Sequence, residues 1–179
     1  AKDKMINAIE VACDLQRFLP ACQRPEHTEG YEGFYHCVGL NGTVEKASVS
    51  YIIRDHDADK FEQKKVFMWA CVDLLKKKYG DEVLTLTVKD QYFNMRKMVE
   101  PHPQVIDKAL EAMERAGVKP LVRPIRGGTD GARLSFEGLP CPNLCAGGEN
   151  FHGRFEYVPV EDMEKITELL ATIIWNIAK

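Results

Sequence analysis

Apolar residues recur at helical spacing in four long stretches of the chain, and each stretch predicts an amphipathic helix. The first stretch begins close to residue 1, and the other three cover residues 57–79, 103–116 and 160–178. Asp57 is expected to cap the second helix, which ends in a lysine run where cations offset the helix dipole. A shorter helix is predicted over residues 130–136.

Shorter apolar runs predict the strands. Two runs, residues 34–40 and 43–54, flank the pair Asn41-Gly42. This pair favours a type I′ turn, because such a turn requires positive φ at both of its central residues, which Asn and Gly tolerate. The two runs are therefore predicted to form a β-hairpin. Three further strands are expected, over residues 83–88, 120–125 and 142–146.

The order of these elements predicts an α/β fold with an α+β first part. Helix, hairpin, helix and strand form a ferredoxin-like split unit that lacks its first strand. Strands then alternate with helices, which is typical of a mixed or parallel α/β layer. The boundary between the two parts is expected between residues 90 and 102.

Composition and charge exclude several classes of protein. The 179 residues correspond to one domain or two small ones, and 24 Lys plus Arg against 27 Asp plus Glu leave a net charge of -3. Such a balance argues against nucleic-acid binding. No apolar run approaches the roughly 18 residues of a membrane span. Six cysteines without a Cys-x-x-Cys pair favour a reducing, cytoplasmic compartment.

The densest chemical signal is the junction between the predicted strand 120–125 and the helix 130–136. Arg126 supplies a forked cation there, and Gly127 and Gly128 let the backbone approach a ligand closely. With Thr129 or Asp130 as helix cap, the junction suits a carboxylate or a developing oxyanion. The alternative interpretation is a tight connector without a ligand.

Two further residues stand out. His152 lies in a glycine-rich loop, and it either binds a metal or is an ordinary surface residue. Cys141 and Cys145 could join it in a zinc site, but the spacing of the three residues fits no standard zinc finger. Arg54, at the end of a strand, either binds a substrate carboxylate bidentately or pairs with Glu29 across the hairpin.

Six blocks of sequence carry a resemblance to a known family. They are Thr28 to His36, Tyr51 to Asp55, Tyr92 to Arg96, Pro124 to Ala132, Gly138 to Leu144 and Gly147 to Gly153. With these blocks the chain resembles, over essentially its whole length, the tripeptide aminopeptidases of the di-zinc metallopeptidase family that also holds glutamate carboxypeptidases and aminoacylases.

The resemblance implies a domain organisation. Residues 1–93 resemble the lid domain of that family without its first strand, and residues 94–179 resemble the closing segment of its catalytic domain. Most zinc ligands and the general base belong to an N-terminal half that this chain lacks, so no catalytic residue is expected in it. His152 matches a metal-binding histidine.

The resemblance also implies substrate contacts and an activity. Arg54 matches a residue that approaches the substrate's terminal carboxylate, and Asn94, Arg126, Gly127 and Gly128 match positions near the substrate. The implied enzyme uses two zinc ions to remove the N-terminal residue from tripeptides. A pair of zinc ions needs about five or six protein ligands, which one histidine does not provide, so the isolated chain is expected to be inactive.

The implied partners are tripeptides and the missing N-terminal half, with neither nucleic acid nor membrane. The alternative function is a non-catalytic module that dimerises, or complements another chain, through the open sheet of the lid.

Overall fold

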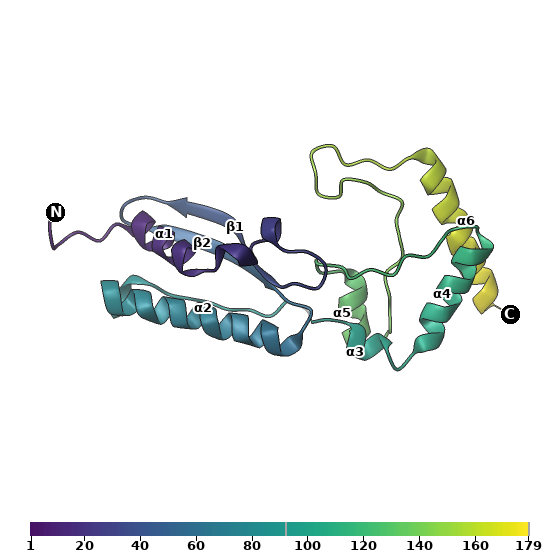
Figure 1. The fold of residues 1–179 in the computed structure, drawn as a ribbon, viewed down its shortest axis with the longest axis horizontal. Coiled ribbons are helices and arrows are strands. Elements are labelled where there is room, and N and C mark those ends of the chain that lie inside the picture. Colours follow the sequence, from purple (N-terminus) through teal and green to yellow (C-terminus); the bar gives the residue numbers. More distant parts are fainter. Residues whose placement is uncertain (92, 179) are drawn as a thin grey trace. The chain divides into compact units, whose positions relative to one another are not determined.

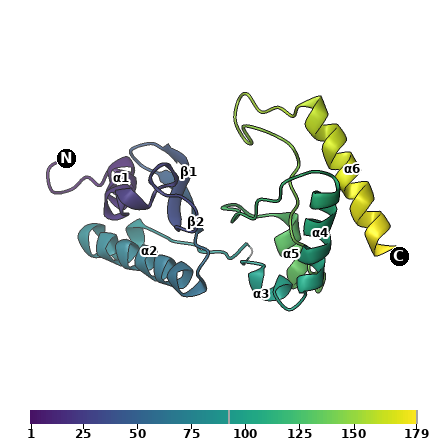
Figure 2. The same cartoon turned by 45° about the vertical axis from the view of Figure 1, so that its right-hand side comes forward.

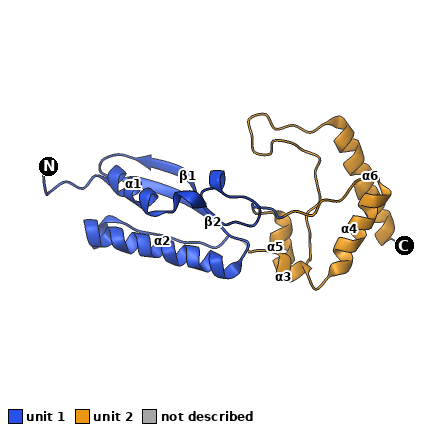
Figure 3. Cartoon of the chain, in the orientation of Figure 1, with its two compact units in different colours: residues 1–91, 124–127 blue, residues 92–123, 128–179 orange. Residues whose placement is uncertain are grey.

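The computed structural model describes residues 1–91 and 93–178, so Tyr92, which opens one of the blocks above, lies outside the described residues. The chain divides into two compact units (Figure 3). The first unit comprises Ala1–Gln91 and Pro124–Gly127, and the second holds the other described residues. This division follows the contacts within the chain; the assignment of residues 1–93 to a lid domain stays a prediction.

The first unit consists of two helices and a hairpin (Figure 1). Its elements, in chain order, are α1 (Ala8–Phe18), the short helices η1 (Ala21–Gln23) and η2 (Pro25–His27), β1 (Phe34–Gly42), β2 (Ala47–Arg54), α2 (Ala58–Tyr79) and η3 (Asp81–Val83). The two strands pair antiparallel. The helices α1 and α2 and the hairpin therefore agree with the elements predicted from the sequence.

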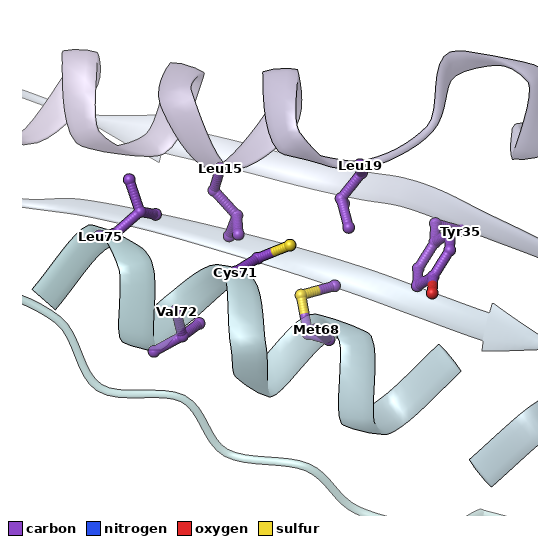
Figure 4. Close-up of a cluster of buried hydrophobic side chains, with 7 residues drawn as sticks. All are labelled: Leu15, Leu19, Tyr35, Met68, Cys71, Val72 and Leu75. Atoms are coloured by element: carbon purple, nitrogen blue, oxygen red, sulfur yellow. The ribbon is translucent and has the colours of Figure 1, made fainter. Parts of the chain in front are cut away.

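The core of the first unit is formed by the apolar faces of its helices. Figure 4 shows Leu15 of α1, and Leu19 directly after this helix, opposite the buried residues of α2, with Tyr35 of β1 at the end of the cluster. Leu75 is fully buried. The helical spacing of the apolar residues in α2 thus gives the face that packs, as the pattern predicted.

Polar contacts fix both ends of α2. The Asp57 side chain accepts a hydrogen bond from the Lys60 N–H at 2.9 Å, which confirms the predicted cap. At the other end, Lys78 Nζ and the Tyr79 hydroxyl donate to Asp14 of α1 at 2.6 and 2.7 Å. These bonds lower the pKa of the Asp14 carboxyl to about 2. The carboxylate is therefore ionised at neutral pH and joins α1 to the end of α2.

The hairpin turn lies further along the chain than predicted. Asn41 and Gly42 still belong to β1, and the turn is formed by the next four residues, with the Thr43 N–H donating to the Lys46 carbonyl at 2.7 Å. A Cβ at Gly42 would lie 2.9 Å from the Ala47 Cβ, so close strand contact explains this glycine. The predicted Asn-Gly turn is therefore wrong.

The changed turn also changes the register. A bulge between Cys37 and Gly39 shifts the pairing once more, and Phe34 lies opposite Arg54. Glu29 precedes the strand altogether. The expectation that Glu29 faces Arg54 across the hairpin is therefore wrong, because it depended on a two-residue loop.

The second unit is helical in its regular structure (Figure 2). Its helices are α3 (Arg96–Val99), α4 (Pro103–Arg115), α5 (Asp130–Phe136) and α6 (Val160–Ile177). The helices α4 and α6 pack through Ala112, Ala116 and Leu169, all buried. Thr129 caps α5 by accepting from the Ala132 N–H at 3.2 Å, which decides between the two predicted caps.

Three predicted strands are wrong. Within the described part of the chain the sheet has two strands, and residues 83–88, 120–125 and 142–146 form no ladder. In the segment expected to be a buried strand, Leu121 and Val122 are 68% and 80% exposed. An extended segment becomes a strand only beside a neighbour about 4.8 Å away, and the described residues supply none. The prediction of a fold that mixes helices and strands is confirmed, whereas residues 1–91 and 93–178 contain no layer of parallel strands.

No helix among the described residues is long and apolar enough to cross a lipid bilayer.

Candidate functional site

Arg54 lies at the C-terminal end of β2 and is half-buried. Its guanidinium donates to the carbonyl of Ile53 at 3.0 Å and to the side-chain oxygen of Gln91 at 3.2 Å. The strand register places Phe34, the first residue of β1, directly opposite. The position at a strand end agrees with the sequence prediction, and the contacts orient the guanidinium.

Arg126 belongs to a four-residue segment, Pro124–Gly127, that joins the first unit, and we call this segment the strap. Its guanidinium donates two hydrogen bonds to Thr28, one to the backbone carbonyl and one to the hydroxyl at 2.6 Å. A third bond goes to the backbone carbonyl of Glu32 at 3.3 Å. It also lies over the Phe34 ring, 5.0 Å from the centroid. The guanidinium is therefore held in one orientation by the loop before β1.

A second contact anchors the strap to the first unit. The ring nitrogen Nε2 of His56 lies 3.0 Å from the carbonyl oxygen of Ile125, and the Tyr31 ring packs edge-on against His56 with centroids 5.1 Å apart. Contacts on both Ile125 and Arg126 make the strap a fixed part of this unit.

The structure thus brings the two predicted carboxylate-binding arginines to the same residue. Arg54 is the cross-strand neighbour of Phe34, and Arg126 stacks on its ring. Both arginines thus contact the first residue of β1, and a guanidinium group suits an anionic partner such as a peptide carboxylate. Tertiary structure supplies this juxtaposition, because 72 positions of the sequence separate the two residues.

The loop before β1 that binds Arg126 contacts Asp55 through Gly33, and neither residue was predicted as a site residue. Asp55 accepts a hydrogen bond from the Asp57 N–H at 3.0 Å and lies 3.6 Å from Lys64 Nζ, with its side chain 3% exposed. A Cβ at Gly33 would lie 2.0 Å from an Asp55 oxygen. Only glycine fits at this position, and the repeated glycines at 30 and 33 were the available signal.

Asn94 and Gly128 belong to the second unit. The Asn94 side-chain oxygen accepts from the Arg96 N–H at 3.0 Å, immediately before α3. Gly127, in the strap, has space beside it, because an added Cβ would meet no described atom within 4 Å. Arg54 and Arg126, in contrast, belong to the first unit.

His152 lies at the tip of an exposed loop of the second unit. Two backbone hydrogen bonds between Glu149 and Tyr157 close the base of the loop. The Glu149 N–H donates to the Tyr157 carbonyl at 2.8 Å, and the Tyr157 N–H donates to the Glu149 carbonyl at 3.2 Å. His152 has a φ of +61°, and its N–H donates to the Glu156 carboxylate at 3.2 Å. This backbone leaves the imidazole outside the packed core, where it can bind a metal ligated by other groups.

The described residues do not form a complete metal centre. They contain no group of three His, Cys, Asp or Glu side chains placed to hold an ion. Cys141, Cys145 and His152, whose spacing fits no standard zinc site, accordingly do not come together as a ligand group. Cys141 lies against α5, where its N–H donates to the buried Ser135 hydroxyl at 3.0 Å, whereas Cys145 is exposed. Among the residues that the structure describes, an exposed imidazole such as that of His152 can therefore supply one ligand but not a whole site.

Comparison with protein families identifies the class. The model described as "Peptidase family M20/M25/M40" matches residues 10–176, and the chain belongs to this peptidase family. Among its relatives are proteins named Peptidase T. That of Alkaliphilus oremlandii is 52% identical over 97% of this chain and 42% of its own length, and that of Clostridium novyi is 55% identical over 97% and 43%.

A solved structure resembles the fold. The aminopeptidase PepT from Bacillus cereus superposes with a TM-score of 0.61 at 21% identity, over 97% of this chain and 46% of the other. This likeness confirms the mixed α/β fold. The chain spans less than half the length of the two Peptidase T relatives and corresponds to their C-terminal portion.

Proposed function

We propose that this chain is the C-terminal portion of a zinc-dependent aminopeptidase that removes the N-terminal residue from tripeptides. Relatives named Peptidase T match 97% of it at 52–55% identity. The structural observation that carries the proposal is the meeting of Arg54 and Arg126 at Phe34. A peptidase that selects short peptides needs an anion-binding point at a fixed distance from the scissile bond, and the Arg54 guanidinium can provide one.

In this proposal the arginines and their neighbours bind and orient the substrate. Arg54 holds the terminal carboxylate of the peptide and so measures its length. Arg126 and Asn94 lie near the carbonyl that reacts and stabilise the negative charge that develops on its oxygen. Gly127 and Gly128 let the backbone approach the peptide, and the open space beside Gly127 leaves room for it.

His152 would hold one of two zinc ions, as an exposed imidazole on a fixed loop can. Zinc supplies Lewis acidity, which polarises the peptide carbonyl and activates water. The other ligands and the general base come from the portion of the protein that precedes the matched segment in the relatives. We further propose a cytoplasmic location, and the six cysteines, all free, agree with a reducing compartment.

A chimeric enzyme tests the proposal. In it, the portion of the Clostridium novyi relative that precedes the matched segment is joined to residues 1–179. We expect the chimera to bind two zinc ions and to hydrolyse tripeptides, and the isolated 179-residue chain to do neither. Metal analysis after dialysis and a tripeptide assay measure both. Two tightly bound zinc ions and turnover in the isolated chain would refute the proposal.

Arg54→Ala in the chimera is expected to raise KM for tripeptides by about 10- to 100-fold with a smaller effect on kcat. The loss of a charge-assisted hydrogen-bonded contact costs about 1.5–3 kcal/mol, which corresponds to this range. Steady-state kinetics with a tripeptide and its C-terminal amide measure the effect, and the amide should show little change. A lower melting temperature with unchanged KM would instead assign Arg54 to a structural role through Gln91.

A further inference from the structure

Asp55 is a buried carboxylate directly beside Arg54 in the chain. It follows the last residue of β2, and its side chain is 3% exposed. The carboxylate lies 3.6 Å from Lys64 Nζ and accepts a hydrogen bond from the Asp57 N–H at 3.0 Å. Since Asp57 caps α2 and Lys64 belongs to that helix, Asp55 is fixed to α2 at two points.

Lys64 supplies the charge that faces Asp55. Its side chain is 12% exposed and donates to the side-chain oxygen of Gln23 in η1 at 2.6 Å. Its Nζ also lies 5.4 Å from the centroid of the Tyr35 ring, and the Tyr35 hydroxyl donates to the Lys64 backbone carbonyl at 3.1 Å. The ammonium is therefore tied to η1 and β1 as well as to Asp55.

The loop before β1 lies against the Asp55 carboxylate. A Cβ at Gly33 would overlap an Asp55 oxygen and would lie 2.6 Å from the Arg54 carbonyl oxygen. The same loop supplies the acceptors for the hydrogen bonds of Arg126. A displaced Asp55 carboxylate would therefore displace the acceptors that hold Arg126.

The residue after Asp55 contacts the strap. Nε2 of His56 lies 3.0 Å from the carbonyl oxygen of Ile125, the neighbour of Arg126. Asp55 thus acts on Arg54 through the chain, and on Arg126 through both His56 and the loop before β1.

We propose that Asp55 and Lys64 are positioning residues that hold the guanidinium groups of Arg54 and Arg126 in place. A buried ion pair adds little stability compared with apolar side chains of similar size, because the cost of removing two charges from water offsets their attraction. Such a pair does define one geometry, and groups that bind a substrate must be held to within about 0.5 Å. The consequence for catalysis rests on the proposed function, whereas the positioning itself does not.

The first test uses the 179-residue chain and needs no peptidase activity. Asp55→Asn and Lys64→Met are combined in one protein, the ion-pair variant, because loss of one charge would leave the other buried and unpaired. The matched control combines Asp14→Asn with Lys78→Met, which removes the ion pair near the other end of α2. NMR measures the exchange of the arginine guanidinium hydrogens with solvent, and circular dichroism measures folding and melting temperature.

We expect the guanidinium hydrogens of Arg126 to exchange at least about tenfold faster in the ion-pair variant, since a loosened loop opens their hydrogen bonds. The guanidinium signals of Arg54 should shift, and the control should change neither arginine. Asp55→Asn with Lys64→Gln keeps a hydrogen-bonding side chain at both positions and replaces the ion-pair variant if that protein does not fold. Unchanged exchange at Arg126 in the folded variant, or an equal change in the control, would overturn the inference.

The second test measures kinetics in the chimera. The ion-pair variant is expected to raise KM for tripeptides about tenfold and to change KM for the C-terminal amide little, because a misplaced Arg54 binds the carboxylate poorly. In the Arg54→Ala background this increase should disappear, since both changes act through one contact. The full increase in that background would indicate a general structural effect and contradict the inference. If Arg54→Ala alone left KM unchanged, the proposed function would fail, and the exchange measurement would still decide the inference.

Discussion

His152→Ala in the chimeric enzyme is expected to lower kcat/KM for tripeptides by at least about 100-fold. Loss of a group that only orients a metal ligand already costs about 10- to 100-fold in metal affinity or activity, and loss of the ligand itself costs more. The zinc content should fall from two ions to about one. Kinetics and metal analysis on the same preparation measure both effects.

The matched control is His102→Ala. His102 is also exposed, and it precedes α4 without a side-chain cap bond to that helix. We expect this variant to keep its zinc and its activity, and both variants to keep the far-ultraviolet circular dichroism of the parent. If His152→Ala retained two zinc ions and full activity, the assignment of His152 as a ligand would be wrong.

Leu75→Ala is expected to lower the free energy of unfolding of the 179-residue chain by about 2–5 kcal/mol. Leu75 is fully buried in the cluster between α1 and α2, so alanine leaves a cavity that neighbouring side chains fill only in part. Urea denaturation followed by tryptophan fluorescence and circular dichroism measures the change. Trp69 lies in α2, near the affected cluster.

The preceding residue of the same helix provides the control. Leu74 is 54% exposed, so Leu74→Ala removes the same atoms from a position that contacts solvent. We expect a change within about 0.5 kcal/mol. Equal destabilisation by the two substitutions would mean that burial of the α2 stripe is not what stabilises this unit.

The candidate site was predicted in part. The sequence singled out Arg54 and Arg126 because each follows a predicted strand, and His152 because it lies in a glycine-rich loop. In the structure both arginines contact Phe34, and His152 lies at the exposed tip of its loop. The loop around Thr28 that binds Arg126 was not predicted as its partner. The two residues are 98 positions apart, and no periodicity in the sequence reports such a contact.

The sequence by itself determined the helices, because their signals are local: apolar residues three or four positions apart, the Asp57 and Thr129 caps, and the lysines that end α2. Tertiary structure alone decided the register of the hairpin and the fate of the other extended segments. A strand exists only through hydrogen bonds to a neighbour, and the residues that supply a neighbour are distant in the chain or belong to another segment of polypeptide. The same dependence on distant residues explains why the environment of Arg126 emerged only from the fold.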